Sequence, residues 1–214
     1  MERLAIIGDV HGCVKSLRAL LDILPPRHQI YQLGDLIDRG PDSRAVVALA
    51  KERGLSCVLG NHEWLMLTGH HPGLPNHESW LANGGGDTLR NYRSHDELLE
   101  LVESVRSFPL FIDIEQPGGT NLLISHAGVR KGLSLKDSID LLHAPGPQQV
   151  MMSILWNRGR VHLDGHFVVF GHSPVVKPVL TPHYANIDTG CVYRRQLTAL
   201  LLPEREFIQV PFQD

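Results

Sequence analysis

The sequence of 214 residues has few cysteines, no excess charge of either sign and no long apolar run. Its three cysteines, Cys13, Cys57 and Cys191, are widely spaced and form no C-x-x-C pair. This pattern argues against a disulfide framework and against a structural zinc site built on thiolates. The first apolar run covers only residues 4–7 and leads directly into a turn. We therefore expect neither a signal peptide nor a membrane span.

The near balance of positive and negative residues argues against nucleic-acid and membrane partners. There are 20 lysines and arginines against 23 aspartates and glutamates, whereas proteins that hold nucleic acid by counterion release need a clear basic excess on one face. No run of like charges suggests a tail that binds a membrane surface. A chain of this length suits one substantial core. We expect a single domain over residues 1–214, cytoplasmic, with neither a nucleic-acid nor a membrane partner.

Short apolar runs alternate with helical patterns in the first third of the chain. The runs at residues 4–7, 30–33 and 57–59 are almost wholly apolar, as expected for strands buried on both faces. Between them, apolar residues at helical spacing predict helices over residues 14–24 and 43–53, the second ending at Gly54. This β-α-β-α-β order predicts parallel strands joined by right-handed crossovers.

The remainder of the chain is predicted to be more antiparallel. Two pairs of strand-like segments flank turn residues and read as hairpins, at residues 108–115 with 121–125 and at 197–202 with 207–211. Further strands are expected at residues 167–170 and 184–187. Helices are expected at residues 62–67, 96–107 and 135–143, the second of them with Ser94 and Glu97 as a capping box.

Polar side chains follow most of the predicted strands. They are Asp9, Asp35, Asn61, His126, His172 and Asp188. Ligands of open α/β sheets collect at the carboxyl ends of strands, so we expect these side chains to lie close together. Aspartate and asparagine are ordinary turn residues. Four histidines near strand-end turns, each with a glycine within two residues, are not explained by turns: His11, His62, His126 and His172. The sequence therefore predicts a shared metal site.

The mixture of carboxylate, imidazole and amide oxygen suits Mn²⁺ best, or Fe²⁺ or Zn²⁺, and suits Ca²⁺ less well. Two such ions about 3.5 to 4 Å apart suit the hydrolysis of phosphate esters. Asp35 is the natural choice for the carboxylate that bridges them. Arg39, four residues further on, suits an anion such as a phosphoryl group.

Five motifs resemble the signature blocks of one family. They are DVHG (residues 9–12), GDLIDRG (34–40), GNHE (60–63), HAG (126–128) and GHS (171–173). Together they resemble the calcineurin-like metallophosphoesterases, specifically the PPP-type serine/threonine phosphatases. The segments WLANGGGDT (80–88) and LWNR (155–158) resemble the small bacterial and bacteriophage members. This resemblance implies an α/β fold with a central mixed β-sandwich flanked by helices, in four layers αββα.

The resemblance also implies a role for each motif residue. Asp9 and His11 would bind the first metal ion, Asp35 would bridge, and Asn61, His126 and His172 would bind the second. His62, oriented by Asp38, would protonate the leaving group. Arg39 and Arg158 would clamp the phosphoryl oxygens, with Asn61 beside them at the substrate. Asp188 matches no metal ligand of the family, so we expect it to hold a ligand or a loop in place.

Two substrates share this framework. We expect a serine/threonine or dual-specificity protein phosphatase, with a symmetrical bis(5'-nucleosyl)-tetraphosphatase as the alternative. Arg194 and Arg195 stand where relatives are expected to have small residues, and two added cations suit a polyphosphate chain. A phosphodiesterase or nuclease is disfavoured, because two arginines suit the dianion of a monoester better than a diester. A non-catalytic metal-binding regulator is disfavoured by the intact His62 and Asp38.

Overall fold

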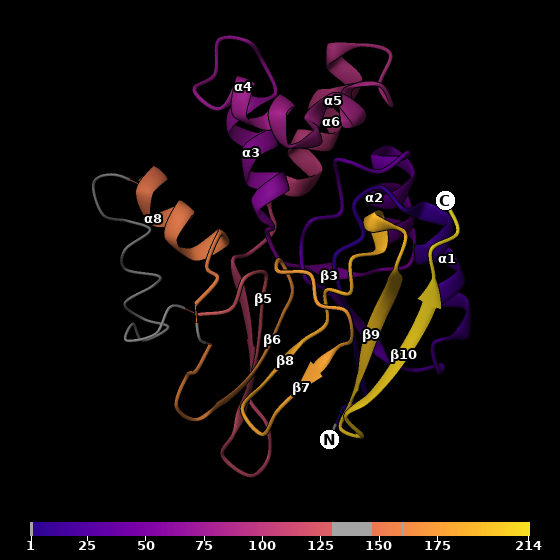
Figure 1. Ribbon diagram of the computed structural model, residues 1–214, viewed down its shortest axis with the longest axis vertical. Helices are drawn as coiled ribbons and strands as arrows, with labels where there is room; N and C mark the ends of the chain where they lie inside the picture. The colour runs from indigo at the N-terminus through magenta and orange to yellow at the C-terminus, as the bar shows by residue number, and fades with distance from the viewer. Residues whose placement is uncertain (1, 130–146, 160) are drawn as a thin grey trace.

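The computed structural model describes residues 2–129, 147–159 and 161–214. Its strands form two five-stranded sheets (Figure 1). Sheet A has the order β10-β9-β1-β2-β3, with the strands Glu206–Pro211, Gln196–Leu202, Leu4–Ile7, Gln29–Gln32 and Ser56–Cys57. Sheet B has the order β4-β5-β6-β8-β7, with the strands Phe111–Ile114, Asn121–Ser125, His166–Phe170, Tyr184–Asn186 and Val179–Leu180.

The strand directions confirm the expected change along the chain. Strands β1, β2 and β3 are parallel, whereas β9 runs antiparallel to β1 and β10 antiparallel to β9. In sheet B the central strands β5, β6 and β8 are parallel, and β4 and β7 pair antiparallel at the two edges. Both predicted hairpins are present, as β4 with β5 and as β9 with β10. Strand β7, only two residues long, was not predicted.

The core explains why the strands are apolar throughout. Successive side chains of a strand point to opposite faces. Leu4 and Ile6 therefore pack between the two sheets, against Ile124 and Val169 of sheet B among others. Ile7 faces the other way and joins the core cluster beneath the helices that cover sheet A. Strand β1 is thus buried on both faces, which places the turn after it in the middle of the molecule.

Helices flank the sheets and confirm the α/β class, with two mixed sheets (Figure 1). Helices α1 (Val14–Ile23) and α2 (Ser43–Glu52) pack on the outer face of sheet A. Helices α3 (Asn61–Gly69) and α6 (His95–Arg106) lie beyond the strand ends. A further helix, α8, covers Pro147–Leu155. In the part of the chain that the structure describes, no helix is long and apolar enough to cross a membrane.

Some local predictions are confirmed and others are wrong. Ser94 accepts a bond from the Glu97 N–H (3.2 Å) at the start of α6, and Gly54 has the left-handed φ of 67° expected of a helix end. The helix predicted over residues 135–143 lies outside the described residues. The segment from residue 77 to residue 89 was not predicted to be helical. It forms α4 (His77–Trp80), a π-helix (Leu81–Gly85) and α5 (Gly86–Leu89).

Residues 83–85 lie at the end of the π-helix rather than in a tight turn, although Gly84 adopts a left-handed φ of 107°. A side chain at Gly84 would collide with Arg39, and one at Gly85 with the ring of Trp80. Gly84 therefore lets the helical segment approach the loop after β2 closely, and Gly85 leaves room for the Trp80 ring. The Gly84 carbonyl accepts a bond from the Arg39 N–H (3.4 Å). The glycines therefore allow close packing under Arg39 and do not reverse the chain.

Candidate active site

The turns that follow β1 and β2 hold each other through their backbones. The N–H groups of Val10 and His11 both donate to the Asp35 carbonyl, at 3.1 and 2.8 Å. His11 and Asp35 have φ values of 48° and 55°, in the left-handed region that non-glycine residues rarely adopt. Such strained residues persist only where surrounding bonds hold them, and they concentrate at functional sites. The two motifs therefore meet as one rigid unit.

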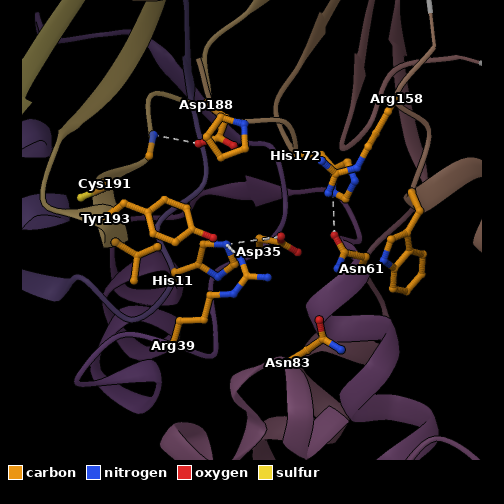
Figure 2. A pocket seen from close by; sticks show the side chains of 14 residues that line it. His11, Asp35, Arg39, Asn61, Asn83, Arg158, His172, Asp188, Cys191 and Tyr193 are labelled. Atoms are coloured by element: carbon orange, nitrogen blue, oxygen red, sulfur yellow. Dashed lines mark hydrogen bonds and ion pairs between the residues drawn. The ribbon is translucent and has the colours of Figure 1, made fainter. Parts of the chain in front are cut away.

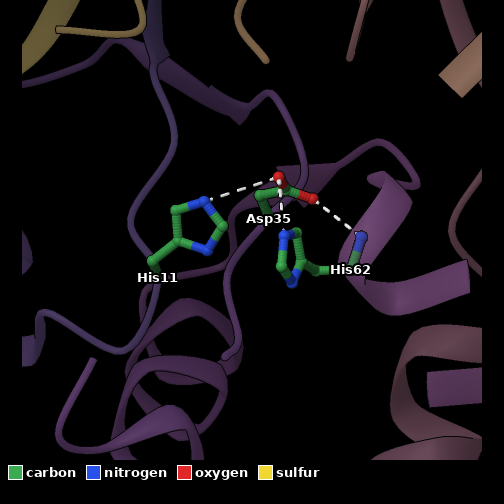
Figure 3. A group of neighbouring side chains, drawn as sticks. All are labelled: His11, Asp35 and His62. Carbon is green, nitrogen blue, oxygen red and sulfur yellow. Dashed lines mark hydrogen bonds and ion pairs between the residues drawn. The ribbon is translucent and has the colours of Figure 1, made fainter. Parts of the chain in front are cut away.

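The first cluster of metal-ligating groups contains His11, Asp35 and His62 (Figure 3). The Asp35 Oδ2 lies 3.5 Å from the His11 Nε2 and 4.0 Å from the His62 Nε2. The His11 Nδ1 donates to the Ile37 carbonyl at 2.9 Å. With its proton on Nδ1, His11 presents the lone pair of Nε2 toward Asp35, as a metal ligand must.

The second cluster contains Asp35, His126 and His172, with Asn61 beside them. The Asp35 Oδ2 lies 3.5 Å from the His126 Nε2. The His126 Nδ1 donates to the Leu33 carbonyl (2.8 Å), which again leaves Nε2 directed into the site. The Asn61 Oδ1 lies 2.8 Å from both the His126 Nε2 and the His172 Nδ1. Asp35 is thus shared by the two clusters, as expected of a bridging ligand.

Asp9 links the two sheets at this site. Its Oδ2 accepts the His172 N–H at 3.1 Å, while its Oδ1 is buried without a partner. The Nε2 atoms of His62 and His172 are also buried and unpartnered. Buried polar atoms in this state are costly unless a ligand satisfies them. The donor set of carboxylates, imidazoles and one amide oxygen therefore fits two divalent cations.

Burial and neighbouring side chains shift the pKa values of the predicted metal ligands. Burial, with the nearby His62, lowers the pKa of His11 to about 3, and burial with the nearby His126 lowers that of His172 to about 3. Both rings are therefore neutral near pH 7 and able to coordinate. Burial favours a protonated Asp35, but interactions with the neighbouring His126, His62 and His11 outweigh it and lower the pKa of Asp35. The pKa of Asp9 is raised by burial and by the charges of Asp188 and Asp35.

His62 forms a buried pair with Asp38. The His62 Nδ1 lies 2.8 Å from the Asp38 Oδ2, and both residues are fully buried. Asp38 is itself held by the Trp80 indole N–H (3.1 Å) and the Thr88 hydroxyl (2.6 Å). Burial lowers the pKa of His62, but the charges of Asp35 and Asp38 outweigh it, so the pKa lies above its ordinary value. Asp38 does not cap the nearby helix α2, because Asp42 does.

Three supporting residues were not assigned roles from the sequence. Glu63 is fully buried, and its carboxylate accepts four backbone N–H groups. Three come from the loop after β2, namely Asp35 (2.7 Å), Leu36 (2.8 Å) and Ile37 (3.4 Å), and the fourth comes from Gly60 (3.0 Å). Trp80 and Thr88 reach Asp38 from the helical segment after residue 76. The GNHE and WLANGGGDT motifs contained all three, but only the tertiary contacts reveal what they hold.

A pocket of about 190 Å³ opens above the two clusters (Figure 2). Arg39 lies on one side of it and donates from Nη1 to the His11 Nε2 at 3.0 Å. The exposed Arg158 lies on the other side, near Asn61 and His172. Asp188 also lines the pocket, and its Oδ1 accepts the Gly190 N–H (2.9 Å). The residues predicted at the site therefore lie around the two clusters and the pocket. Asp9 and Asp188 belong to neither cluster, whereas His62, predicted to be the general acid, is a member of the first.

Comparison with known proteins agrees with this geometry. Residues 2–195 match the calcineurin-like phosphoesterase family, so the chain belongs to it. The protein is thus a hydrolase that acts on phosphate esters. It is 29% identical to "Bis(5'-nucleosyl)-tetraphosphatase PrpE [asymmetrical]" of Oceanobacillus iheyensis, over 97% of this chain and 92% of that protein. It is 31% identical to "Serine/threonine-protein phosphatase 1" of Salmonella typhimurium, over 90% and 88% of the two chains.

Solved structures share the fold. A protein serine/threonine phosphatase from Saccharomyces cerevisiae superposes with a TM-score of 0.66 at 16% identity, covering 99% of this chain and 80% of that one. A structure described as a candidate diadenosine tetraphosphatase superposes with a TM-score of 0.67 at 24% identity, covering 100% and 95%. At these identities the likeness concerns the fold alone, and the substrate has to be argued from the site.

Proposed function

We propose that this protein is a phosphomonoesterase that uses two divalent cations and direct attack by water. Asp9 and His11 would hold one cation, Asn61, His126 and His172 the other, and Asp35 both. When bound, such a pair of cations lowers the pKa of water and polarises the phosphoryl oxygens. Mn²⁺ suits this mixed oxygen and nitrogen donor set, and Fe²⁺ or Zn²⁺ are alternatives. The single observation that carries the proposal is the buried His62–Asp38 pair beside the shared Asp35.

His62 is the proposed general acid. Asp38 binds Nδ1, which leaves Nε2 unpartnered and directed toward Asp35. The raised pKa of His62 favours a proton on that nitrogen. The proton passes to the oxygen of the leaving group as the P–O bond breaks, so that an alcohol rather than an alkoxide departs. Water supplies the new oxygen on phosphorus, and no covalent phosphoenzyme is formed.

Arg39 and Arg158 are the proposed clamp for the phosphoryl group, with the Asn61 amide beside them. They approach the pocket from opposite sides (Figure 2). Guanidinium groups match the charge that spreads over the phosphoryl oxygens during displacement. Two of them suit a monoester dianion. The first substrate class we propose is therefore a phosphoprotein, at serine or threonine and also at tyrosine. The Salmonella relative supports this choice.

A dinucleoside tetraphosphate is the second candidate. Relatives named bis(5'-nucleosyl)-tetraphosphatase support it, and those names specify asymmetrical rather than the symmetrical cleavage that the sequence led us to expect. Arg194 and Arg195 add two exposed cations to the loop that follows Asp188. Such charges would meet phosphates beyond the one being hydrolysed. The cleavage position would be read from the products, which are AMP with ATP, or ADP alone.

The test compares His62→Asn with wild type, using the surface variant His71→Asn as the control. With Mn²⁺ and a phosphoserine peptide, we expect His62→Asn to lower kcat by about 10² to 10⁴-fold. The loss should shrink for para-nitrophenyl phosphate, whose leaving group needs no proton. Bound manganese, measured by elemental analysis, should stay at two ions per chain. Loss of one ion would make His62 a ligand instead, and full activity on the peptide would refute the acid role.

A further inference from the structure

Tyr193 is a half-exposed aromatic residue in the wall of the catalytic pocket. Its relative exposure is 52%, which is unusual for a large side chain in this well-packed fold. Figure 2 shows it on the same side as His11 and Arg39, across the pocket from Asn61 and Arg158. It lines the pocket that contains Asp35 and Asn61, yet neither metal binding nor proton transfer requires it.

The loop that carries Tyr193 is held firmly. It forms a short 3-10 helix (Cys191–Tyr193) whose last N–H donates to the Gly190 carbonyl at 3.0 Å. The Gly190 N–H donates in turn to the buried Asp188 (2.9 Å). Gly190 has a φ of 71°, and a side chain there would press on the Tyr193 ring, 3.3 Å from its Cδ2. The backbone that carries the ring is therefore fixed before any substrate arrives, which lowers the entropy cost of using the ring.

We propose that Tyr193 is a specificity-determining residue that stacks on a flat leaving group. This inference rests on the proposed phosphoesterase function and names its preferred substrates. A half-exposed ring gains by covering its face with another ring. Trp156 adds a second aromatic side chain to the same pocket and is held edge-on by Trp64, with ring centroids 5.6 Å apart. The shared chemistry is an aromatic group next to the phosphate, from either a phosphotyrosine or a nucleobase.

The test measures selectivity in Tyr193→Ala and Tyr193→Phe. The substrates are a phosphotyrosine peptide, a phosphoserine peptide of the same sequence, diadenosine tetraphosphate and inorganic tetraphosphate, all with Mn²⁺. The readouts are two ratios of kcat/KM, tyrosine over serine peptide and dinucleotide over inorganic tetraphosphate. In Tyr193→Ala we expect at least one ratio to fall about fivefold, through KM, the usual worth of one stacked pair. In Tyr193→Phe both ratios should stay near wild type.

The ratio that falls identifies the source of the flat group. Unchanged ratios in Tyr193→Ala would overturn the assignment, and so would an equal fall in Tyr193→Phe, which would make the hydroxyl rather than the ring the contact. Because each ratio compares two substrates of one variant, a general loss of activity cancels. If wild type hydrolysed none of the four substrates, the proposed function would fail; hydrolysis with unchanged ratios would remove only the role of Tyr193.

Discussion

The two walls of the site are built differently. The wall from sheet A consists of the loops after β1, β2 and β3, and its own residues bind one another: Glu63 receives N–H groups of the loop after β2, and Asp38 binds His62. The wall from sheet B carries His126 and His172, which are bonded across to sheet A. The His126 Nδ1 donates to the Leu33 carbonyl, and the His172 N–H donates to Asp9.

This difference indicates how the two sides of a site between two sheets are held in position. The sheet A wall has its own scaffold, so the acid and the bridging carboxylate hold their geometry independently of sheet B. The sheet B wall takes its position from sheet A through a few hydrogen bonds. It also carries the exposed Arg158, and its strand β8 leads into the Tyr193 loop, which reaches the His11 side of the pocket. We infer that chemistry resides mainly in the first wall and substrate choice mainly in the second.

Removing the residue shared by both walls should have the largest effect. Asp35→Asn takes away the carboxylate that both clusters contain. We expect the variant to bind neither cation tightly and to lose activity below detection, because the second proposed site then lacks its only carboxylate and the first keeps only that of Asp9. Elemental analysis after gel filtration measures the metal content. Asp22→Asn, at a surface ion pair with Arg53, is the control. Two retained ions in Asp35→Asn would contradict the bridging role.

Asp188, in the wall from sheet B, should make the stability of the metal-free protein depend on pH. Its pKa is raised to about 6, mainly because the carboxyl group is buried. The hydrogen bond from the Gly190 N–H lowers this pKa, and the charge of Asp35 raises it further. Between the ordinary aspartate pKa and this value the folded protein binds more protons than the unfolded chain. Stability therefore falls as pH rises through that window, and above it ionised Asp188 costs about 3 kcal/mol in metal-free protein.

Asp188→Asn removes this cost and keeps an acceptor for the Gly190 N–H. In urea unfolding at about pH 8, the metal-free variant should be more stable than wild type by up to about 3 kcal/mol. The gain should shrink below about 1 kcal/mol at about pH 4, where the aspartate is protonated. Asp164→Asn, at an exposed position, should show no such pH dependence. A gain that is equal at both pH values would contradict the assignment to Asp188.

Glu63 tests the scaffold of the first wall. Its two oxygens accept N–H groups only, so Glu63→Gln would place an amide NH₂ against at least one N–H donor. We expect a loss of about 2 kcal/mol in the free energy of unfolding. Weaker binding of both cations should accompany the loss, because the Asp35 loop shifts. Glu115→Gln, on an exposed turn, is the control. Stability equal to wild type would show that the first wall does not depend on Glu63.

The sequence was sufficient for the elements of the first third, for both hairpins and for the candidate site residues, but not for β7, α8 or the helical segment after residue 76. Apolar runs of strand length, apolar residues at helical spacing and turn residues predicted β1 to β3, α1, α2 and both hairpins, because these signals are local. The polar residues after the strands converge as expected, because carboxyl ends of parallel strands meet at one edge. The segment from residue 77 to residue 89 was missed, because its helical turns are stabilised by packing under Arg39 and Asp38 rather than by local propensity.

The sequence by itself determined which side chains meet, since strand order and the position of each polar residue at a strand end place them at the same rim. Only the tertiary structure decided how they are held. Contacts between residues far apart in the chain give Asp38 its partners Trp80 and Thr88, give Glu63 its N–H groups, and turn Tyr193 toward the pocket. These contacts depend on packing and backbone geometry across distant segments, which no pattern along the chain records.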